Sequence, residues 1–229
     1  MFNIDNDNEC LTKEYAKKQL KDAAVFGARS SCGLHSAGQV RDLKVHHESM
    51  TLDEYNQHGK SLIITYGSCP SPFGKCFVAS TPRGICQLAF YDHASEQAIF
   101  EKMLYREWAN AHVERDDLQI QQFEKSLFSL TSDEKKSLRV LLRGSPFQLK
   151  VWEALLSIPA GELVSYQHIA SFIGKTRAVR AVASAIARNN IAYLIPCHRV
   201  IRQTGDVGQY RWGSVRKRAL IAWEAYQVR

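Results

Sequence analysis

Three short apolar runs, separated by turn signals, constrain the fold of this chain more than any other feature. Residues 61–67, 75–80 and 84–92 read SLIITYG, KCFVAS and GICQLAFYD, and they are rich in β-branched and aromatic residues. The intervening stretches, SCPSPFG and TPRG, carry the proline and glycine of tight turns. We therefore expect a small antiparallel meander, with helices over 95–111 and 117–130, where the apolar spacing becomes helical.

The last third of the chain reads as helical. Ser145 precedes Pro146, which suits an N-cap followed by the first helical position. Ser165 is placed to cap a second helix that Gly174 ends, and a third helix is expected from about Thr176 to Arg188. Two helices joined by so short a turn have the outline of a helix-turn-helix. A further helical stretch, SVRKRALIAWEAY, follows near the C-terminus.

The first segment, residues 1–59, reads as short helices. It has a Gly/Ser break at 30–33 and a second helical stretch from Ser36. Thr51 and Glu54 are spaced as a capping box for one more short helix. Helix, break, helix again has the outline of a helix-turn-helix, although many helical linkers share it.

The positive charge of the chain is concentrated in its last third. The 229 residues, enough for one large domain or two to three small ones, carry a net charge of +7. Residues 146–229 hold 12 Lys and Arg against 4 Asp and Glu, a balance of +8. Such a patch attracts a polyanion, most often nucleic acid, but a solvated basic surface would have the same composition. The alanine-rich third helix favours DNA, because small residues let a helix approach a groove closely.

Targeting signals and metal motifs are missing from the sequence. It has no run of about 20 apolar residues, and its start, MFNIDNDNEC, is unlike a secretory signal, so we expect a cytosolic protein without a membrane segment. The six cysteines form no C-x-x-C pair and no Cys/His cluster of the zinc-binding kind. We therefore expect no metal and read five of them as small apolar fillers.

The sixth cysteine, Cys197, lies in the run LIPCHRVIRQ. A thiolate is the nucleophilic form of cysteine, and His198 with the arginines that follow it could favour that form. A lone C-H dipeptide is weak evidence, and by itself leaves an inert structural cysteine as the better interpretation. Glu224 could orient His198 in a nucleophile, base and orienter triad, but a surface salt bridge fits its position equally well.

Longer stretches resemble a known family. PFQLKVWEALLSIPAGELVSYQHIA, KTRAVRAVASAIARNNIAYLIPCHRVI and GQYRWG are similar to the DNA-repair alkyltransferases that act on O6-alkylguanine, and YRWG resembles the Ada-type bacterial members. The resemblance runs from about residue 60 to the C-terminus. It implies an α+β fold in which a ribonuclease H-like domain with a small antiparallel sheet, 60–144, precedes a winged-helix-like DNA-binding and catalytic domain, 145–229.

The resemblance also implies catalytic roles. Cys197 would accept the alkyl group irreversibly, once per molecule. His198 would remove the thiol proton through a water, Glu224 would hold His198, and Asn189 would brace this network. Tyr166 would protonate the guanine ring nitrogen, so that the base leaves neutral.

The implied substrate is O6-alkylguanine in double-stranded DNA, with O4-alkylthymine left open, and the nucleotide must be flipped out of the helix. Arg180 matches the family's arginine finger, on a helix that lies in the minor groove. The carbonyls of Cys197 and Val200 would read the guanine amino group, Tyr210 would cover the base, and the N–H of Arg211 could donate to the guanine oxygen. Trp212 is expected to narrow the pocket, which favours methyl lesions over free benzylated guanine. The other expected DNA contacts are Arg177, Ala178, Ser184 and Arg188.

No cofactor is implied, and single-turnover chemistry needs only a monomer. Residues 25–55 resemble the second helix-turn-helix of AraC-type regulators, so 1–59 is interpreted as a helical remnant that helps DNA binding or simply packs on the core. The main alternative function is a non-enzymatic DNA-binding transcriptional regulator that uses this segment. It would bind a specific sequence whether or not Cys197 is present.

Overall fold

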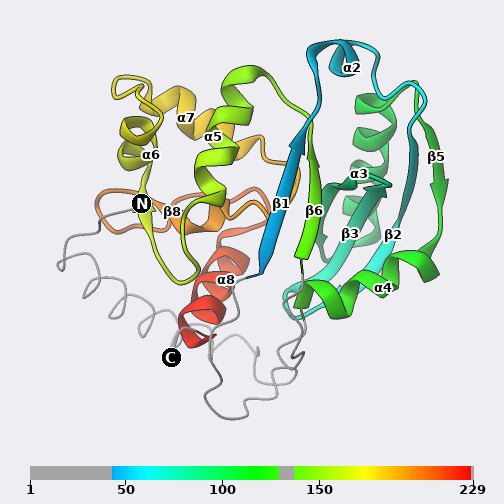
Figure 1. The fold of residues 1–229 in the computed structure, drawn as a ribbon. Helices are drawn as coiled ribbons and strands as arrows, with labels where there is room; N and C mark the ends of the chain where they lie inside the picture. Colours follow the sequence, from blue (N-terminus) through cyan, green and yellow to red (C-terminus); the bar gives the residue numbers. More distant parts are fainter. Residues whose placement is uncertain (1–42, 129–136, 228–229) are drawn as a thin grey trace. The chain divides into compact units, whose positions relative to one another are not determined.

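The computed structural model describes residues 43–128 and 137–227, which form two compact units (Figure 1). We call residues 43–149 with 189–194 the sheet unit, and residues 150–188 with 195–227 the helical unit. The boundary between them falls within one helix, α5. The helices expected before residue 43, and most of the AraC-like stretch, lie outside the described residues.

The sheet unit contains a six-stranded mixed sheet in the order β1-β6-β4-β3-β2-β5. The expected meander is confirmed, because β2 pairs antiparallel with β3, and β3 with β4. Three parallel pairs, β1 with β6, β4 with β6, and β2 with β5, extend it. The elements are β1 (Lys44–Ser49), α2 (Leu52–Asn56), β2 (Ile63–Ser71), β3 (Gly74–Thr81), β4 (Gly84–Tyr91), α3 (Ala94–Glu107), β5 (His112–Arg115), α4 (Asp117–Phe128) and β6 (Ser137–Leu142).

One expectation for this region is wrong. The segment 1–59 was interpreted as helical, but Lys44–Ser49 is the edge strand β1, paired in register with Ser137–Leu142 of β6. Its sequence, KVHHES, is polar and lacks the apolar residues typical of a buried strand. Polar and charged residues are common in edge strands, which pair with a neighbour on one side only. The partner lies far along the chain, so local sequence could not reveal the pairing. The capping box of Thr51 and Glu54 is confirmed at the start of α2.

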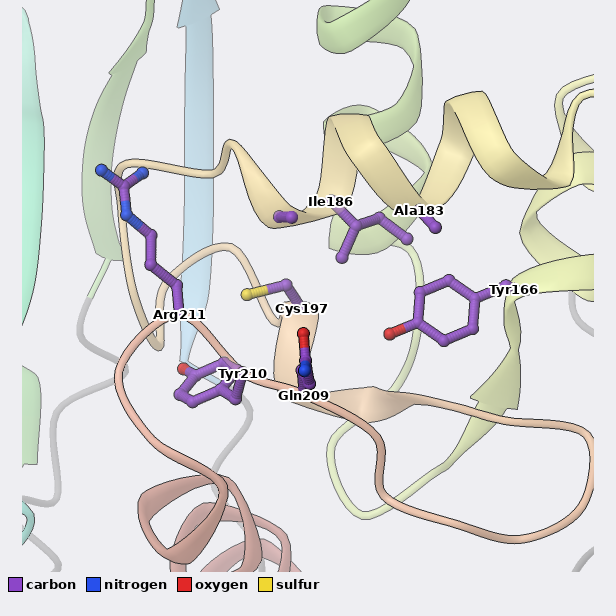
Figure 2. A pocket seen from close by; sticks show the side chains of 8 residues that line it. Tyr166, Ala183, Ile186, Cys197, Gln209, Tyr210 and Arg211 are labelled. Carbon is purple, nitrogen blue, oxygen red and sulfur yellow. The ribbon is translucent and has the colours of Figure 1, made fainter.

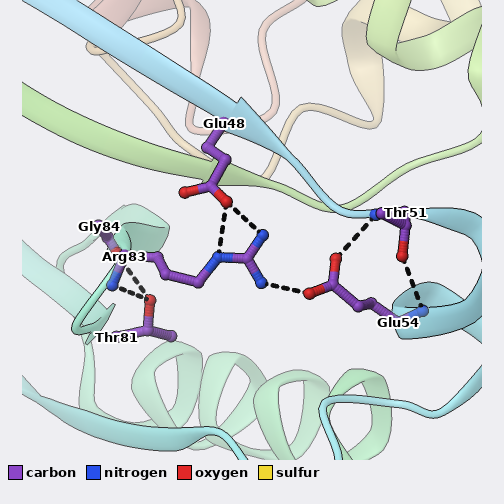
Figure 3. A network of polar contacts seen from close by, with 6 residues as sticks. All are labelled: Glu48, Thr51, Glu54, Thr81, Arg83 and Gly84. Atoms are coloured by element: carbon purple, nitrogen blue, oxygen red, sulfur yellow. Dashed lines mark hydrogen bonds and ion pairs between the residues drawn. The ribbon is translucent and has the colours of Figure 1, made fainter.

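Arg83 ties β1 and α2 to the turn between β3 and β4 (Figure 3). Its Nη2 and Nε atoms donate to Oε1 of Glu48 on β1 at 2.6 and 2.9 Å. Its Nη1 donates to Oε1 of Glu54 at 2.6 Å, and this bond is the main reason why the pKa of Glu54 lies below its ordinary value. One guanidinium thus connects three elements in a forked, charge-assisted geometry.

The side of β4 that faces β6 is only partly paired, and it also binds the segment that leads to Cys197. Strand β4 pairs with β6 only at Ile85. Further along, the Leu88 N–H donates to the Asn190 carbonyl at 2.9 Å, and the Ala192 N–H donates to the Leu88 carbonyl at 2.8 Å. The ring of Tyr193 lies 5.4 Å from that of Phe128, centroid to centroid. Residues 189–194 are therefore fixed on the sheet just before the chain reaches the candidate site.

The helical unit contains most of α5 (Pro146–Leu156), then β7 (Val164–Ser165), α6 (Tyr166–Phe172), α7 (Val179–Ala187), the 3-10 helix Cys197–Arg199, β8 (Val200–Ile201) and α8 (Ser214–Gln227). The expected caps are confirmed: Ser145 accepts from the Gln148 N–H at 3.3 Å and Ser165 from the His168 N–H at 3.0 Å. Gly174, with φ of 72°, follows the end of α6.

The two helices of the expected helix-turn-helix are α6 and α7. Helix α7 begins at Val179, later than the expected Thr176, because residues 175–178 form a turn closed by the Ala178 N–H and the Lys175 carbonyl. Its buried face packs inward, and Trp152 of α5 donates its Nε1–H to the Ala185 carbonyl at 2.9 Å. The mixed sheet and the helices together make an α+β protein.

We predict that Gly84→Ala destabilises the fold by about 3 kcal/mol or more. Gly84 has φ of 143°, and a Cβ there would lie 2.5 Å from the Arg139 carbonyl oxygen of β6, a backbone atom that cannot move alone. Gly205→Ala is the matched control, since Gly205 has φ of 86° and open space around it, and should cost only about 1 kcal/mol. Urea denaturation measures both variants. Equal losses would contradict this account of the β4–β6 approach.

Candidate active site

Two short strands place Cys197 and Tyr166 in the same region. Val164 and Ser165 of β7 pair in parallel with Val200 and Ile201 of β8. Helix α6 begins with Tyr166 directly after β7, and the 3-10 helix that begins with Cys197 directly precedes β8. The two side chains are 31 positions apart in the sequence but are held by one strand pair.

Cys197 is 5% exposed and lines a pocket of about 230 Å³. Figure 2 shows Cys197 with Tyr166 on one side and Tyr210 and Arg211 on the other, and with Ala183 and Ile186 of α7 above it. The expected pocket residues Tyr210 and Arg211 are present, whereas Gln209 and the α7 residues were not anticipated. The lining residues are Tyr166, Ala183, Ile186, Ala187, Cys197, Gln209, Tyr210 and Arg211.

His198, which follows Cys197 in the sequence, forms a buried pair with Glu224 of α8. His198 is fully buried and its Nε2 lies 2.8 Å from Oε1 of Glu224, which is 5% exposed. Arg199 also binds this carboxylate, through Nε at 3.0 Å to Oε2 and Nη2 at 2.8 Å to Oε1. The structure thus brings together two of the residues expected to cooperate, His198 and Glu224, and adds Arg199 to them.

The protonation states of this pair follow from its surroundings. Burial alone would raise the pKa of Glu224, but the charges and hydrogen bonds of His198 and Arg199 outweigh it and hold that pKa well below its ordinary value. Burial lowers the pKa of His198, and Glu224 offsets this only in part. Arg199 is always charged, so it keeps Glu224 ionised even when His198 is neutral. Neutral His198 then donates Nε2–H to Glu224, and its Nδ1 is the basic nitrogen.

Both pocket tyrosines hold their protons firmly. Burial, and secondly the charge of Cys197, raises the pKa of Tyr166 above its ordinary value. The same two causes raise the pKa of Tyr210 further. Trp212 supports Tyr210 from the side, with ring centroids 5.1 Å apart in an edge-on arrangement. Two neutral phenols therefore flank the sulfur.

Lys217 is a site residue that the sequence interpretation missed. It is 1% exposed, and its Nζ donates to the carbonyls of Val200 and Val207 at 2.6 Å each. Burial lowers its pKa to about 8, and the nearby charge of Cys197 opposes that shift. A signal was available, since Lys217 shares helical spacing with Leu220, Ile221 and Glu224 on the inner face of α8.

The outer face of α7 is small and basic. Arg180, Ser184 and Arg188 are exposed, as is Arg177 before the helix, while Ala178 is its half-buried N-cap. Alanine and serine leave the helix backbone accessible between the arginines. A small, basic face of this kind suits contact with the phosphates and grooves of nucleic acid.

The pocket lining lacks Val200 and Trp212, which were expected there, and Asn189, which was expected to brace His198, lies elsewhere. The Val200 carbonyl accepts from Lys217, although a carbonyl has a second lone pair for a ligand. Trp212 is buried behind Tyr210. Asn189 belongs to the sheet unit, where its side chain donates to the Ile191 carbonyl and accepts from the Ile191 N–H. Contacts of these residues with a bound base, or with His198, stay predictions.

Among residues 43–128 and 137–227, no three His, Cys, Asp or Glu side chains gather as metal ligands would. No helix within those ranges is long and apolar enough to cross a membrane.

Comparison with known proteins gives consistent matches. Residues 146–226 match the protein-family model described as "6-O-methylguanine DNA methyltransferase, DNA binding domain". The crystal structure of Mycobacterium tuberculosis OGT in complex with DNA is similar, with 32% identity and a TM-score of 0.55. That match covers 72% of this chain and 94% of the mycobacterial one.

Two curated relatives are longer than this chain. The bifunctional transcriptional activator/DNA repair enzyme Ada of Escherichia coli is 40% identical over 178 residues, which is 77% of this chain and 49% of that protein. Regulatory protein ada of Salmonella typhimurium is 35% identical over 215 residues, which is 91% of this chain and 60% of that protein. The chain therefore spans about half to three fifths of the length of these relatives.

We predict that His198 makes the fold less stable as the pH falls from 7 to 5. An unfolded histidine gains its proton near pH 6.5, whereas buried His198 gains it at lower pH. Between these two pKa values the unfolded chain binds more protons than the folded chain does. The free energy of unfolding therefore decreases as the pH is lowered. In His198→Gln the contribution of this histidine to the slope of the free energy of unfolding against pH disappears.

Urea denaturation across this pH range measures the slope, with His46→Gln, which replaces an exposed histidine of β1, as the control. Identical slopes in the wild type and His198→Gln would contradict this prediction, because His198 would then take up its proton over the same pH range in the folded and the unfolded chain.

Proposed function

Because the chain belongs to the O6-methylguanine-DNA methyltransferase family, we propose that it repairs DNA by moving the alkyl group of O6-alkylguanine irreversibly to its own Cys197. The observation that carries this proposal is the buried His198–Glu224 pair, bonded at 2.8 Å, beside a cysteine at the wall of a small pocket. A base, its orienting carboxylate and a nucleophile are the parts that thiol activation needs.

The chemistry is a single displacement. Neutral His198 takes the Cys197 proton through a water, and Glu224 stabilises the imidazolium that forms. The thiolate attacks the alkyl carbon, so an S–C bond forms while the C–O6 bond breaks and its electron pair stays with the guanine. Nothing in the pocket offers a way to cleave the resulting thioether, so each molecule reacts once.

Tyr166 supplies the proton that the departing guanine needs. Its raised pKa keeps the phenol protonated at neutral pH, and it lines the same pocket as Cys197. Protonation of the ring nitrogen lets guanine leave as a neutral base. Tyr210 covers the base, and the Val200 carbonyl and the Arg211 N–H read its edge.

DNA binds along α7. The alkyl carbon is out of reach inside a stacked duplex, so the nucleotide turns out into the pocket, which α7 lines through Ala183, Ile186 and Ala187. Arg180 fills the space that the base leaves, and Arg177 and Arg188 pair with phosphates. O4-alkylthymine is a possible second substrate of the same pocket.

The finer assignments belong to the same proposal. Residues 60–144, which lie within the sheet unit, correspond to a ribonuclease H-like domain, and residues 145–229, which include the described helical unit, to a winged-helix-like domain, with Asn189 as a brace for His198. The protein works as a cytosolic monomer without a cofactor. The remnant of an AraC-type helix-turn-helix, expected over 1–59, is proposed only for the part before β1, because Lys44–Ser49 is a strand of the sheet. Regulation of transcription is the second candidate function, since the Escherichia coli relative is named a transcriptional activator as well as a repair enzyme.

Counting turnovers tests the proposal. With duplex that contains O6-methylguanine in excess, the amount of methylguanine lost should equal the amount of protein and then stop, and Cys197→Ala should remove none. Continued turnover would exclude a self-alkylating acceptor. If the wild type and Cys197→Ala both bound one specific undamaged sequence, and neither removed methylguanine, the result would favour a transcriptional regulator.

We predict that Tyr166→Phe slows methyl transfer about 100-fold at saturating DNA, the usual contribution of a general acid. DNA affinity should hardly change, because the ring remains. Rapid-quench single-turnover kinetics measures the rate, and Tyr226→Phe on α8, outside the pocket, is the control. A Tyr166→Phe rate within a factor of about two of the wild type would remove Tyr166 from the mechanism.

A further inference from the structure

Two thiols face each other in the sheet unit, in a part of the chain that the alkyl-transfer chemistry does not use. Cys69 on β2 and Cys76 on β3 are register partners in the antiparallel pair. They are 3% and 0% exposed, and neither takes part in a disulfide. The tight turn between the two strands, at residues 72 and 73, fixes this register.

The strand geometry suits a covalent link between them. Directly opposite residues of antiparallel strands have Cα atoms about 4.5 to 5.5 Å apart and side chains on the same face. Disulfides span Cα separations of about 4.4 to 6.8 Å. The Cα separation of Cys69 and Cys76 therefore suits an S–S bond, which also requires both side chains to rotate and their Cβ atoms, about 4.5 to 5.5 Å apart in such pairs, to come within about 3.5 to 4.5 Å.

The pair also differs electrostatically from an isolated buried thiol. A hydrogen bond from Cys76 lowers the pKa of Cys69, although burial and the charge of Glu124 oppose the change. Cys86 on β4 is an internal comparison: its thiol donates to the Ala79 carbonyl at 3.5 Å, and burial raises its pKa to about 12. Because the thiolate is the reactive form, Cys69 is favoured over Cys86 for oxidation.

We propose that Cys69 and Cys76 form an oxidation site, at which a small peroxide links the two strands by a disulfide within one chain. The Cys69 thiolate attacks one peroxide oxygen, the O–O bond breaks, and Cys69 becomes a sulfenic acid as the first water is released. The Cys76 sulfur then displaces the sulfenic oxygen as a second water. The two thiols lose two electrons in total, and hydrogen peroxide gains them.

The hairpin that carries this pair supports the chain leading to Cys197. Phe73, at its turn, lies 6.3 Å from the ring of Tyr193, centroid to centroid, and 6.2 Å from that of Phe128. Tyr193 has φ of 64°, a left-handed conformation that side chains rarely adopt and that packing must hold. The disulfide would therefore link the two strands close to the turn whose Phe73 packs against Tyr193.

The test uses the full chain with Cys197→Ala, which removes the pocket thiol. The protein is treated briefly with hydrogen peroxide, unfolded in urea with iodoacetamide, and analysed by intact mass and non-reducing peptide mapping. We expect the loss of two hydrogens, reversal by dithiothreitol, and one linked peptide that joins Cys69 to Cys76. Added Cys69→Ser or Cys76→Ser should abolish the mass loss, and added Cys86→Ser, the matched control, should retain it.

Peptide mapping of the chain with both thiols decides the proposal even if a serine variant folds poorly. The proposal is overturned if Cys69 and Cys76 both take up iodoacetamide after the treatment, or if either links to Cys10, Cys32 or Cys86. Conversion of Cys69 to a sulfinic acid in place of the disulfide would overturn it as well, because Cys76 would then have failed to capture the sulfenic acid.

Discussion

The buried carboxylate of Glu224 is the interaction on which the candidate site depends. It accepts from His198 and from two nitrogens of Arg199, and the Gly161 N–H lies 3.4 Å from it. Arg199 also donates to the Ile158 carbonyl, just beyond the end of α5. A buried charge is tolerated only when it is paired and hydrogen-bonded. Removal of Glu224 would therefore leave Arg199 as an uncompensated charge and release the 3-10 helix that presents Cys197.

Hydrogen bonds also fix the segments that precede and follow Cys197. Before it, residues 189–194 add to the open edge of β4, and Tyr193 keeps a left-handed conformation there. After it, Lys217 fastens the carbonyls of Val200 and Val207, one in β8 and one in the loop that ends in the pocket residues 209–211. A nucleophile must be positioned to within a fraction of an ångström, and these anchors serve that need.

Local signals in the sequence predicted the local structure well. The caps at Ser145 and Ser165 and the meander are confirmed, because each depends on residues close in the chain. Strand β1 was misjudged because its partner β6 lies far away, and no local pattern records that pairing. The spacing of Glu224 alone could not separate a triad from a salt bridge. The resemblance to the alkyltransferases named Glu224 but not Lys217, whose helical spacing with Leu220, Ile221 and Glu224 was the signal left unused.

The most direct test of the account is the intact mass of the protein after incubation with a duplex that holds one O6-methylguanine. The account predicts a gain of one methyl group per chain, mapped by peptide analysis to Cys197, and no gain in Glu224→Gln over the same short time. Methylation at another residue, or an unchanged mass under conditions where the duplex is bound, would contradict it.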